Sequence, residues 1–112
     1  MPPSLSTHVL DTAHGIPAEG VHLVVEVLGR EWQTVAEGRT NADGRCPGLL
    51  PEGRFGPGRW RIRFDVGPYF AARGQPCFFP YAEIVFDVAD LSRHHHVPLL
   101  VSPFGYSTYR GS

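Results

Sequence analysis

The sequence lacks the features that direct a protein into a membrane, out of the cell or onto nucleic acid. No run of about 18 apolar residues occurs, so no membrane-spanning helix is expected. Residues 1–6 do not combine a positively charged start with an apolar stretch, as a secretory signal does, and we therefore expect a cytoplasmic protein. The formal net charge is −1 and no segment forms a basic stripe, which argues against a nucleic-acid partner.

Cysteine is scarce and the chain is short. The two cysteines, Cys46 and Cys77, allow one disulfide, although two buried thiols are the favoured interpretation. A length of 112 residues is typical of a single domain, which we expect to span residues 1–112. Such a domain buries about two-thirds of its unfolded surface, which supports one core but no deep private cavity. A sizeable pocket would therefore form between subunits, and we expect an oligomer.

The sequence does contain short segments in which apolar and polar residues alternate, separated by 13 glycines and 11 prolines. A period of two is typical of a strand with one buried face. We predict strands at 8–10, 21–28, 32–39, 59–66, 82–88, 95–101 and 105–110. The side chains expected in the core from the two clearest strands are Trp60, Ile62, Phe64, Val66, Ile84, Phe86 and Val88.

Three segments interrupt this series of strands. Residues 15–17 and 41–44 have the composition of turns, and Gly44 is free to take a positive φ. Residues 68–74 begin with proline and end with glycine, which predicts a helix of one to two turns. Strands spaced so regularly around one short helix predict an all-β sandwich.

Three consecutive histidines open the strand at 95–101. Val97, Leu99 and Val101 share one face of this strand, so His94 and His96 share the other. Two imidazoles on an outward face can be solvated surface residues, zinc ligands or catalytic groups, and alternation leaves all three interpretations open. His8, Arg45 and the tail at 109–112 likewise have ordinary surface interpretations when each is taken alone.

Taken together, these segments resemble the 5-hydroxyisourate hydrolases, the enzymatic relatives of transthyretin. The matching stretches are 5–13, 15–18, 40–45, 69–70, 79–80, 96–103 and 109–112, which together span essentially the whole chain. The tail is the most specific stretch, because transthyretin itself, a hormone carrier, lacks it. One departure is His95, where relatives commonly have tyrosine. Alternation turns His95 to the other face, so we expect little effect on the chemistry.

The resemblance implies a fold, an assembly and a site. The fold is a transthyretin-like β-sandwich of two four-stranded antiparallel sheets with one short helix. The assembly is a homotetramer, a dimer of dimers, with active sites in the channel between dimers. The implied catalytic residues are His8, Arg45, His96 and Ser112, and the implied substrate-binding residues are Tyr109, Arg110 and Gly111.

The implied reaction opens the N1–C6 amide bond of 5-hydroxyisourate during urate breakdown, giving 2-oxo-4-hydroxy-4-carboxy-5-ureidoimidazoline. Histidine titrates near neutral pH and can activate water. We assign His8 as general base, helped by Ser112, and His96 as the group that orients water or substrate and passes protons to the leaving nitrogen. The two histidine roles could be exchanged. Arg45 would stabilise negative charge at the attacked carbonyl, so no metal or cofactor is required.

Two other functions remain open on the sequence. One is a transthyretin-like carrier that binds a small ligand without chemistry, although a carrier channel favours apolar walls with few polar groups. The other is a structural or metal-binding sandwich that uses the histidine strand.

Overall fold

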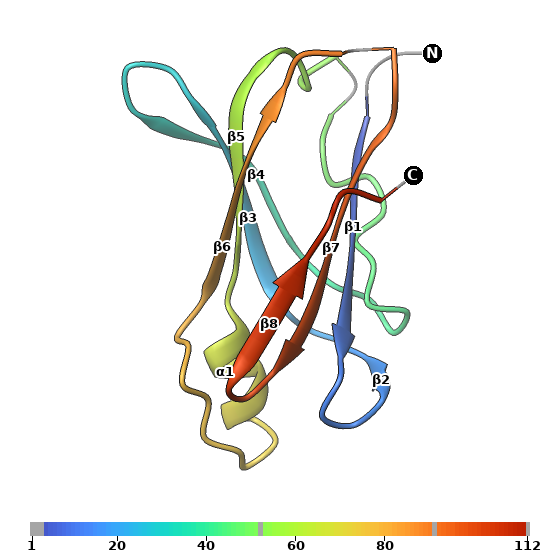
Figure 1. The fold of residues 1–112 in the computed structure, drawn as a ribbon, viewed down its shortest axis with the longest axis vertical. Coiled ribbons are helices and arrows are strands. Elements are labelled where there is room, and N and C mark those ends of the chain that lie inside the picture. The colour runs from blue at the N-terminus through green and yellow to red at the C-terminus, as the bar shows by residue number, and fades with distance from the viewer. Residues whose placement is uncertain (1–3, 52, 91, 112) are drawn as a thin grey trace.

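The computed structural model describes residues 4–51, 53–90 and 92–111. The elements of this part of the chain are β1 (Leu5–Asp11), β2 (Ile16–Pro17), β3 (His22–Leu28), β4 (Trp32–Arg39), β5 (Gly58–Phe64), α1 (Val66–Ala71), β6 (Ala82–Val88), β7 (His95–Ser102) and β8 (Gly105–Thr108) (Figure 1). The predicted strands 32–39 and 82–88 match β4 and β6 in their bounds. β1 is longer than the predicted 8–10, and the predicted turn at 15–17 contains the two-residue strand β2.

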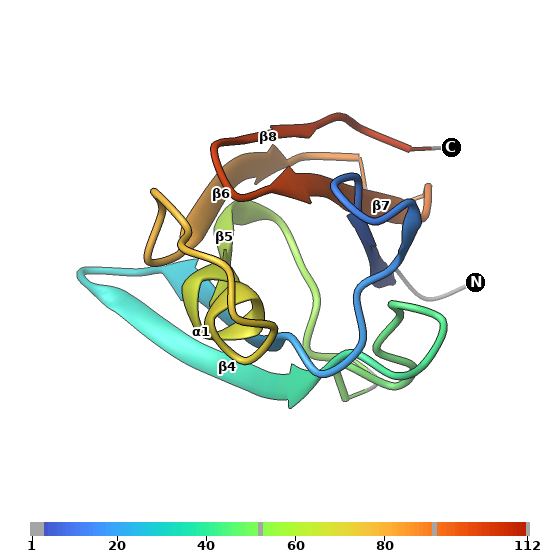
Figure 2. The ribbon, with the colours of Figure 1, turned by 90° about the horizontal axis from the view of Figure 1, so that it is seen from below.

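The strands form two layers, which Figure 2 shows from one end. One four-stranded sheet has the order β2–β1–β7–β8 and the other has the order β4–β3–β5–β6. The predicted sandwich of two four-stranded sheets with one short helix is thereby confirmed.

One strand pairing corrects the prediction that both sheets are antiparallel. β1 and β7 run parallel, in register from Leu5 opposite His95 to Asp11 opposite Val101. Strands joined by a tight hairpin must be antiparallel, whereas β1 and β7 are connected through the whole of the other sheet and can run in the same direction. The histidine strand therefore lies beside the first strand, as Figure 1 shows.

The core lies between the two sheets. Trp60, Ile62, Phe64 and Val66 are buried there as predicted. Ile84 and Phe86 of β6 are only partly buried, because β6 is the last strand of its sheet and no further strand covers them. Val88, at the end of the same strand, is buried.

Helix α1 lies at one end of the sandwich and starts two residues earlier than the predicted 68–74. Tyr69 and Phe70 on this helix are buried, and the Tyr69 hydroxyl donates to Oδ2 of Asp11 at 2.8 Å. Asp11 is the last residue of β1, so this hydrogen bond links the helix to the strand that contains His8. Burial, followed by the bond to Asp11, raises the pKa of Tyr69 to about 12.

Two findings bear on the membrane and disulfide expectations. Within the described residues, no helix is both long and apolar enough to cross a bilayer. Cys46 and Cys77 are both unpaired and half-buried.

Candidate active site

The outer face of the β2–β1–β7–β8 sheet collects most of the predicted catalytic groups. In β1 the inward side chains are buried and the outward ones are half-buried, and Ser6 and His8 are among the outward set. The parallel register places Ser6 opposite His96 and His8 opposite Pro98. Alternate residues of a strand share a face, so His8 lies on the same side of the sheet as Ser6 and His96. His8 is two residues further along β1 than Ser6, the residue opposite His96.

The loop that follows β4 brings Arg45 to this face. Arg45 forms an isolated antiparallel bridge with His8, and the Val9 amide donates to the Gly44 carbonyl at 2.8 Å. Gly44 has φ 75°, and a Cβ there would lie 2.3 Å from the Val9 carbonyl oxygen. The loop therefore needs glycine at this position to approach β1 closely enough to place Arg45 beside His8.

One hydrogen bond fixes the protonation of neutral His8. Its Nε2 lies 2.8 Å from the carbonyl oxygen of Asp43. A carbonyl oxygen can only accept, so Nε2 carries the hydrogen and the neutral ring keeps its lone pair on Nδ1. Among the described residues, Nδ1 of His8 has no hydrogen-bond partner. His8 is thus held with a proton-accepting nitrogen available.

His96 is held on its other nitrogen. Its Nδ1 lies 2.7 Å from Oγ of Ser6, and that same oxygen lies 2.6 Å from Nε2 of His94. Oγ of Ser4 in turn lies 2.5 Å from Nδ1 of His94. The nitrogen of His96 that remains for substrate is therefore Nε2.

The surroundings of His96 favour its neutral form. Burial lowers the pKa of His96 most, and the positive charges of Arg45, His94 and His8 lower it further. These effects outweigh a hydrogen bond with the Ser6 backbone, which raises the pKa. The influence of Arg45 and His8 on this ring shows that the three groups form one electrostatic cluster.

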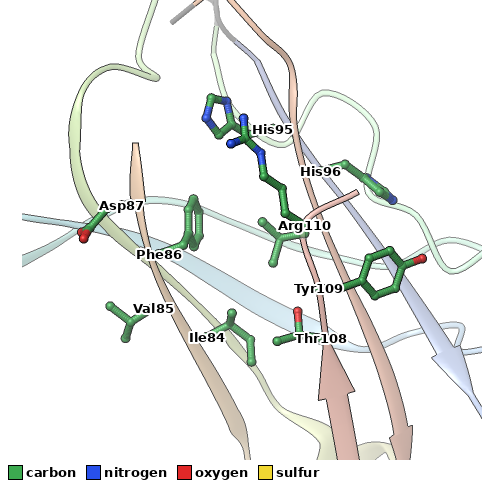
Figure 3. A pocket seen from close by; sticks show the side chains of 10 residues that line it. Ile84, Val85, Phe86, Asp87, His95, His96, Thr108, Tyr109 and Arg110 are labelled. Atoms are coloured by element: carbon green, nitrogen blue, oxygen red, sulfur yellow. The ribbon is translucent and has the colours of Figure 1, made fainter. Parts of the chain in front are cut away.

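The tail continues the sheet beyond β8. The Gly111 amide donates to the His96 carbonyl at 2.8 Å, and a Cβ on Gly111 would lie 2.4 Å from Cδ2 of the His96 imidazole. Glycine is required there because the backbone lies directly against the ring. Tyr109 is exposed and points to the same side of the strands as His96, as Figure 3 shows. Ser112, the fourth predicted catalytic residue, lies outside the described residues.

Arg110 does not join this cluster. Its side chain is directed toward His95, on the opposite side of the strands from Tyr109 and His96 (Figure 3). His95 is buried against Phe55, with ring centroids 5.4 Å apart, so it faces the core as alternation predicted. Burial, and then the charge of Arg110, lower the pKa of His95.

A groove beside β6 does not coincide with the place where the predicted catalytic groups meet. The groove, of about 220 Å³, opens between β6 and the ends of β7 and β8, and it is lined mainly by apolar atoms of residues 84–87, 95–97 and 108–110. His96 borders this groove, but its ring is turned away from it (Figure 3). The predicted groups His8, Arg45 and His96 lie instead on the open outer face of the sheet.

The histidine strand does not form a metal site with other described side chains. Within residues 4–51, 53–90 and 92–111, no three His, Cys, Asp or Glu side chains converge in a metal-binding arrangement. The rings of His94 and His96 are stacked, with centroids 6.4 Å apart, and the Ser6 hydroxyl bridges their nitrogens.

Sequence reasoning overlooked the contribution of Ser4 and Ser6. Alternation alone places Ser6 on the same face as His8, but it does not show that β1 pairs with β7. The parallel register supplies that information. It places Ser6 beside the histidine strand, where its hydroxyl contacts both His94 and His96.

Known proteins resemble this chain in both sequence and fold. A 5-hydroxyisourate hydrolase of Mus musculus is 47% identical over 111 residues, covering 96% of this chain and 94% of the relative. The structure of Klebsiella pneumoniae 5-hydroxyisourate hydrolase has a TM-score of 0.86 and 38% identity, covering 98% of this chain and 94% of that one. Sea bream transthyretin in complex with thyroxine has a TM-score of 0.91 and 35% identity, covering 96% and 93% of the two chains.

The sequence also matches a protein-family description over nearly its whole length. The match covers residues 5–111, which include every described residue of the cluster formed by His8, Arg45 and His96. The chain belongs to the HIUase/Transthyretin family.

Proposed function

We propose that this protein, as one domain spanning residues 1–112, hydrolyses the N1–C6 bond of 5-hydroxyisourate to give 2-oxo-4-hydroxy-4-carboxy-5-ureidoimidazoline in urate degradation. The observation that carries the proposal is the meeting of His8, Arg45 and His96 on one face of the sheet. Fold alone does not separate a hydrolase from a carrier, because transthyretin and a hydrolase structure both superpose well. The curated relative named as a 5-hydroxyisourate hydrolase supports the hydrolase.

His8 is the general base of this reaction. Its bare Nδ1 accepts a proton from water while the water oxygen bonds to the C6 carbonyl carbon. Arg45 stabilises the negative charge that develops on the carbonyl oxygen, since its guanidinium is charged at every working pH. No ion pair between described residues involves either group, so both remain available to water and substrate.

His96 completes the hydrolysis. When the C6–N1 bond breaks, N1 needs a proton, and Nε2 of His96 is the nitrogen positioned to donate it. Gly111 holds the His96 ring from the side of the tail. We assign Ser112 to assist His8, and Tyr109 and Gly111 to border the substrate. Substrate contact by Arg110 stays a prediction, since in the single chain its side chain turns toward His95.

The site is open in a single chain, and this supports the expected tetramer. Arg45 is exposed and His8 and His96 are only half-buried, so the face does not by itself exclude water from a bound substrate. A second copy facing this sheet would enclose it, and we infer a dimer of dimers with the sites between dimers. Two unpaired thiols suit a reducing compartment, which supports a cytoplasmic location.

The deciding experiment follows freshly generated 5-hydroxyisourate by its ultraviolet absorbance. We expect decay much faster than the spontaneous background, and we expect His8→Gln to remove most of the acceleration while the folded circular dichroism spectrum is retained. Decay at the background rate, combined with saturable binding of the compound, would replace this proposal with a carrier.

A further inference from the structure

Four side chains on the site face form an unbroken row of hydrogen bonds. Ser4, His94, Ser6 and His96 are joined by contacts of 2.5, 2.6 and 2.7 Å in that order. They alternate between the two neighbouring chain segments: Ser4 immediately precedes β1, His94 immediately precedes β7, and the parallel register sets Ser6 opposite His96. The mechanism above uses only the last of the four.

The Ser6 hydroxyl couples the two imidazoles. It carries one hydrogen, so it can donate to only one of the two ring nitrogens and must accept from the other. If Ser6 donates to Nδ1 of His96, then Nε2 of His94 must donate to Ser6. The row can therefore pass a proton in one direction and reset in the other.

A neutral His96 has difficulty acting as an acid without help. Burial and the charge of Arg45 hold the pKa of His96 below its usual value, so the ring enters the reaction neutral at neutral pH. Loss of the Nε2 proton from a neutral imidazole leaves an anion unless Nδ1 gains a proton at the same time. The only described group in hydrogen-bonding contact with Nδ1 is Ser6.

We propose that Ser6 and His94 are positioning residues that form a proton relay behind His96, with His94 as the proton source for the leaving nitrogen. This inference rests on the hydrolase function proposed above. As the C6–N1 bond breaks, N1 takes the Nε2 proton of His96. The Ser6 hydroxyl proton moves to Nδ1 of His96, and the Nε2 proton of His94 moves to Oγ of Ser6. The row as a whole gives up one proton, which leaves from His94 and is replaced there from solvent.

The surroundings suit this direction of transfer. The charged and titratable groups that act on His96 are Arg45 from the loop after β4, His8 from β1 and His94 from its own strand. All of them disfavour a positive charge on His96. His94 is exposed, so water can return its proton after each turnover. The row thus supplies a proton to N1 without placing a positive charge on His96.

The test measures kcat for 5-hydroxyisourate in wild type, Ser6→Ala, Ser6→Thr and His94→Ala. We expect Ser6→Ala and His94→Ala to lower kcat by about 10- to 100-fold, a part of the roughly 10²–10⁴ that acid–base catalysis contributes, with KM little changed. Ser6→Thr keeps the hydroxyl and should recover most of the rate. Thr34→Ala, which removes an exposed hydroxyl from the other sheet, is the matched control and should leave kcat unchanged.

Two readouts separate a relay from a merely structural role. The kcat of wild type should depend on the deuterium fraction of the solvent along a curve, which reports several protons in flight, and that of His94→Ala should follow a straight line. Imidazole added to the buffer should restore turnover to His94→Ala, because the vacated position is open to solvent, and should not affect Ser6→Ala.

The relay is overturned if folded Ser6→Ala and His94→Ala keep kcat within twofold of an active wild type. A reduced rate with an unchanged deuterium curve and no imidazole rescue also overturns it, since the two residues would then only hold the ring in place. Wild type that fails to accelerate the decay would instead refute the hydrolase function itself.

Discussion

The outer faces of the two sheets treat their charged groups in opposite ways. On the β4–β3–β5–β6 sheet, each of the three arginines of β5 has a carboxylate partner. The pairs are Arg59 with Asp87 at 2.7 Å, Arg61 with Glu26 at 2.8 Å and Arg63 with Asp65 at 3.3 Å. On the β2–β1–β7–β8 sheet, the cluster of His8, Arg45 and His96 forms no ion pair with any described residue.

The difference separates charges that are paired within the protein from charges that remain available to a ligand. A guanidinium beside a carboxylate has part of its charge balanced by that partner. Arg45 has no carboxylate partner among the described residues, so its charge acts on His96 and on any anion that approaches the face. The comparison predicts that substitutions on the paired face change stability and leave turnover unchanged, and that substitutions on the unpaired face act mainly on turnover.

Arg45→Ala tests the unpaired face with the largest expected effect. Loss of one charge-stabilising donor costs about 10²–10³ in kcat. The free energy of unfolding should stay near that of wild type, because no ion pair is broken. Kinetics with 5-hydroxyisourate and urea unfolding on the same sample measure both. A large loss of stability with normal turnover would reverse the contrast between the two faces.

Glu26→Gln tests the paired face. The Glu26 and Arg61 side chains are only 11% and 22% exposed, and this substitution keeps the shape of Glu26 while removing the charge that holds Arg61. We expect the free energy of unfolding to fall by about 1–3 kcal/mol, as for a hydrogen bond to a charged group, with kcat unchanged. The stacking of Arg61 over Trp32, at 4.3 Å, limits the loss. Reduced turnover without reduced stability would show that the faces are coupled.

Two histidines sharpen the comparison through pH. Asp65, and then Glu37, raise the pKa of His22 above 6.5, whereas burial and Arg45 lower that of His96 below 6.5. His22 therefore adds stability that is complete below the unfolded pKa and is lost as pH rises through its folded value. His96 acts oppositely, because its contribution is present above the unfolded pKa and is lost as pH falls through its folded value.

Nuclear magnetic resonance of the imidazole rings measures this directly. The His22 midpoint should lie above 6.5 and the His96 midpoint below it, since 6.5 is the reference value for both. In urea unfolding, His22→Gln should cost more stability at about pH 5.5 than at about pH 8.5, and His96→Gln should cost less. Midpoints in the reverse order would contradict the contrast.

Arg59→Gln should have the smallest effect. Arg59 and Asp87 are both largely exposed, and exposed ion pairs contribute little to stability. We expect the thermal midpoint and kcat to match those of wild type within error, in low and high salt. A clear drop in midpoint that salt abolishes would mean that this pair contributes more than its exposure suggests.

Alternation predicted the strands that have one apolar face and missed strand residues whose buried side chains are polar. The bounds of β6 followed directly from the pattern. β1 was placed too short because Thr7 and Asp11 point inward: Thr7 donates to the Val97 carbonyl at 2.6 Å, and Asp11 accepts from Tyr69. Buried polar residues with internal partners have no signature in a hydrophobic pattern.

The site was predictable only in part, for a topological reason. The outward direction of His94 and His96 and the inward direction of His95 followed from alternation. The nearness of His8 and Arg45 came from a family resemblance, since neither spacing nor charge indicates that residues 8, 45 and 96 meet. That meeting depends on the parallel pairing of β1 with β7 and on a loop that needs Gly44.

β1 meets its main partner late in protein synthesis. Ser6 and His96 are 90 positions apart, so the first strand leaves the ribosome long before the strand beside it exists. Among the described residues, β1 pairs before that time only with β2, at Leu10 and Asp11, and with the loop at Gly44 and Arg45. Exposed strand edges invite aggregation between nascent chains. Ser6 and His8 make most of the outward face of β1 polar, which opposes such aggregation while the strand waits for β7.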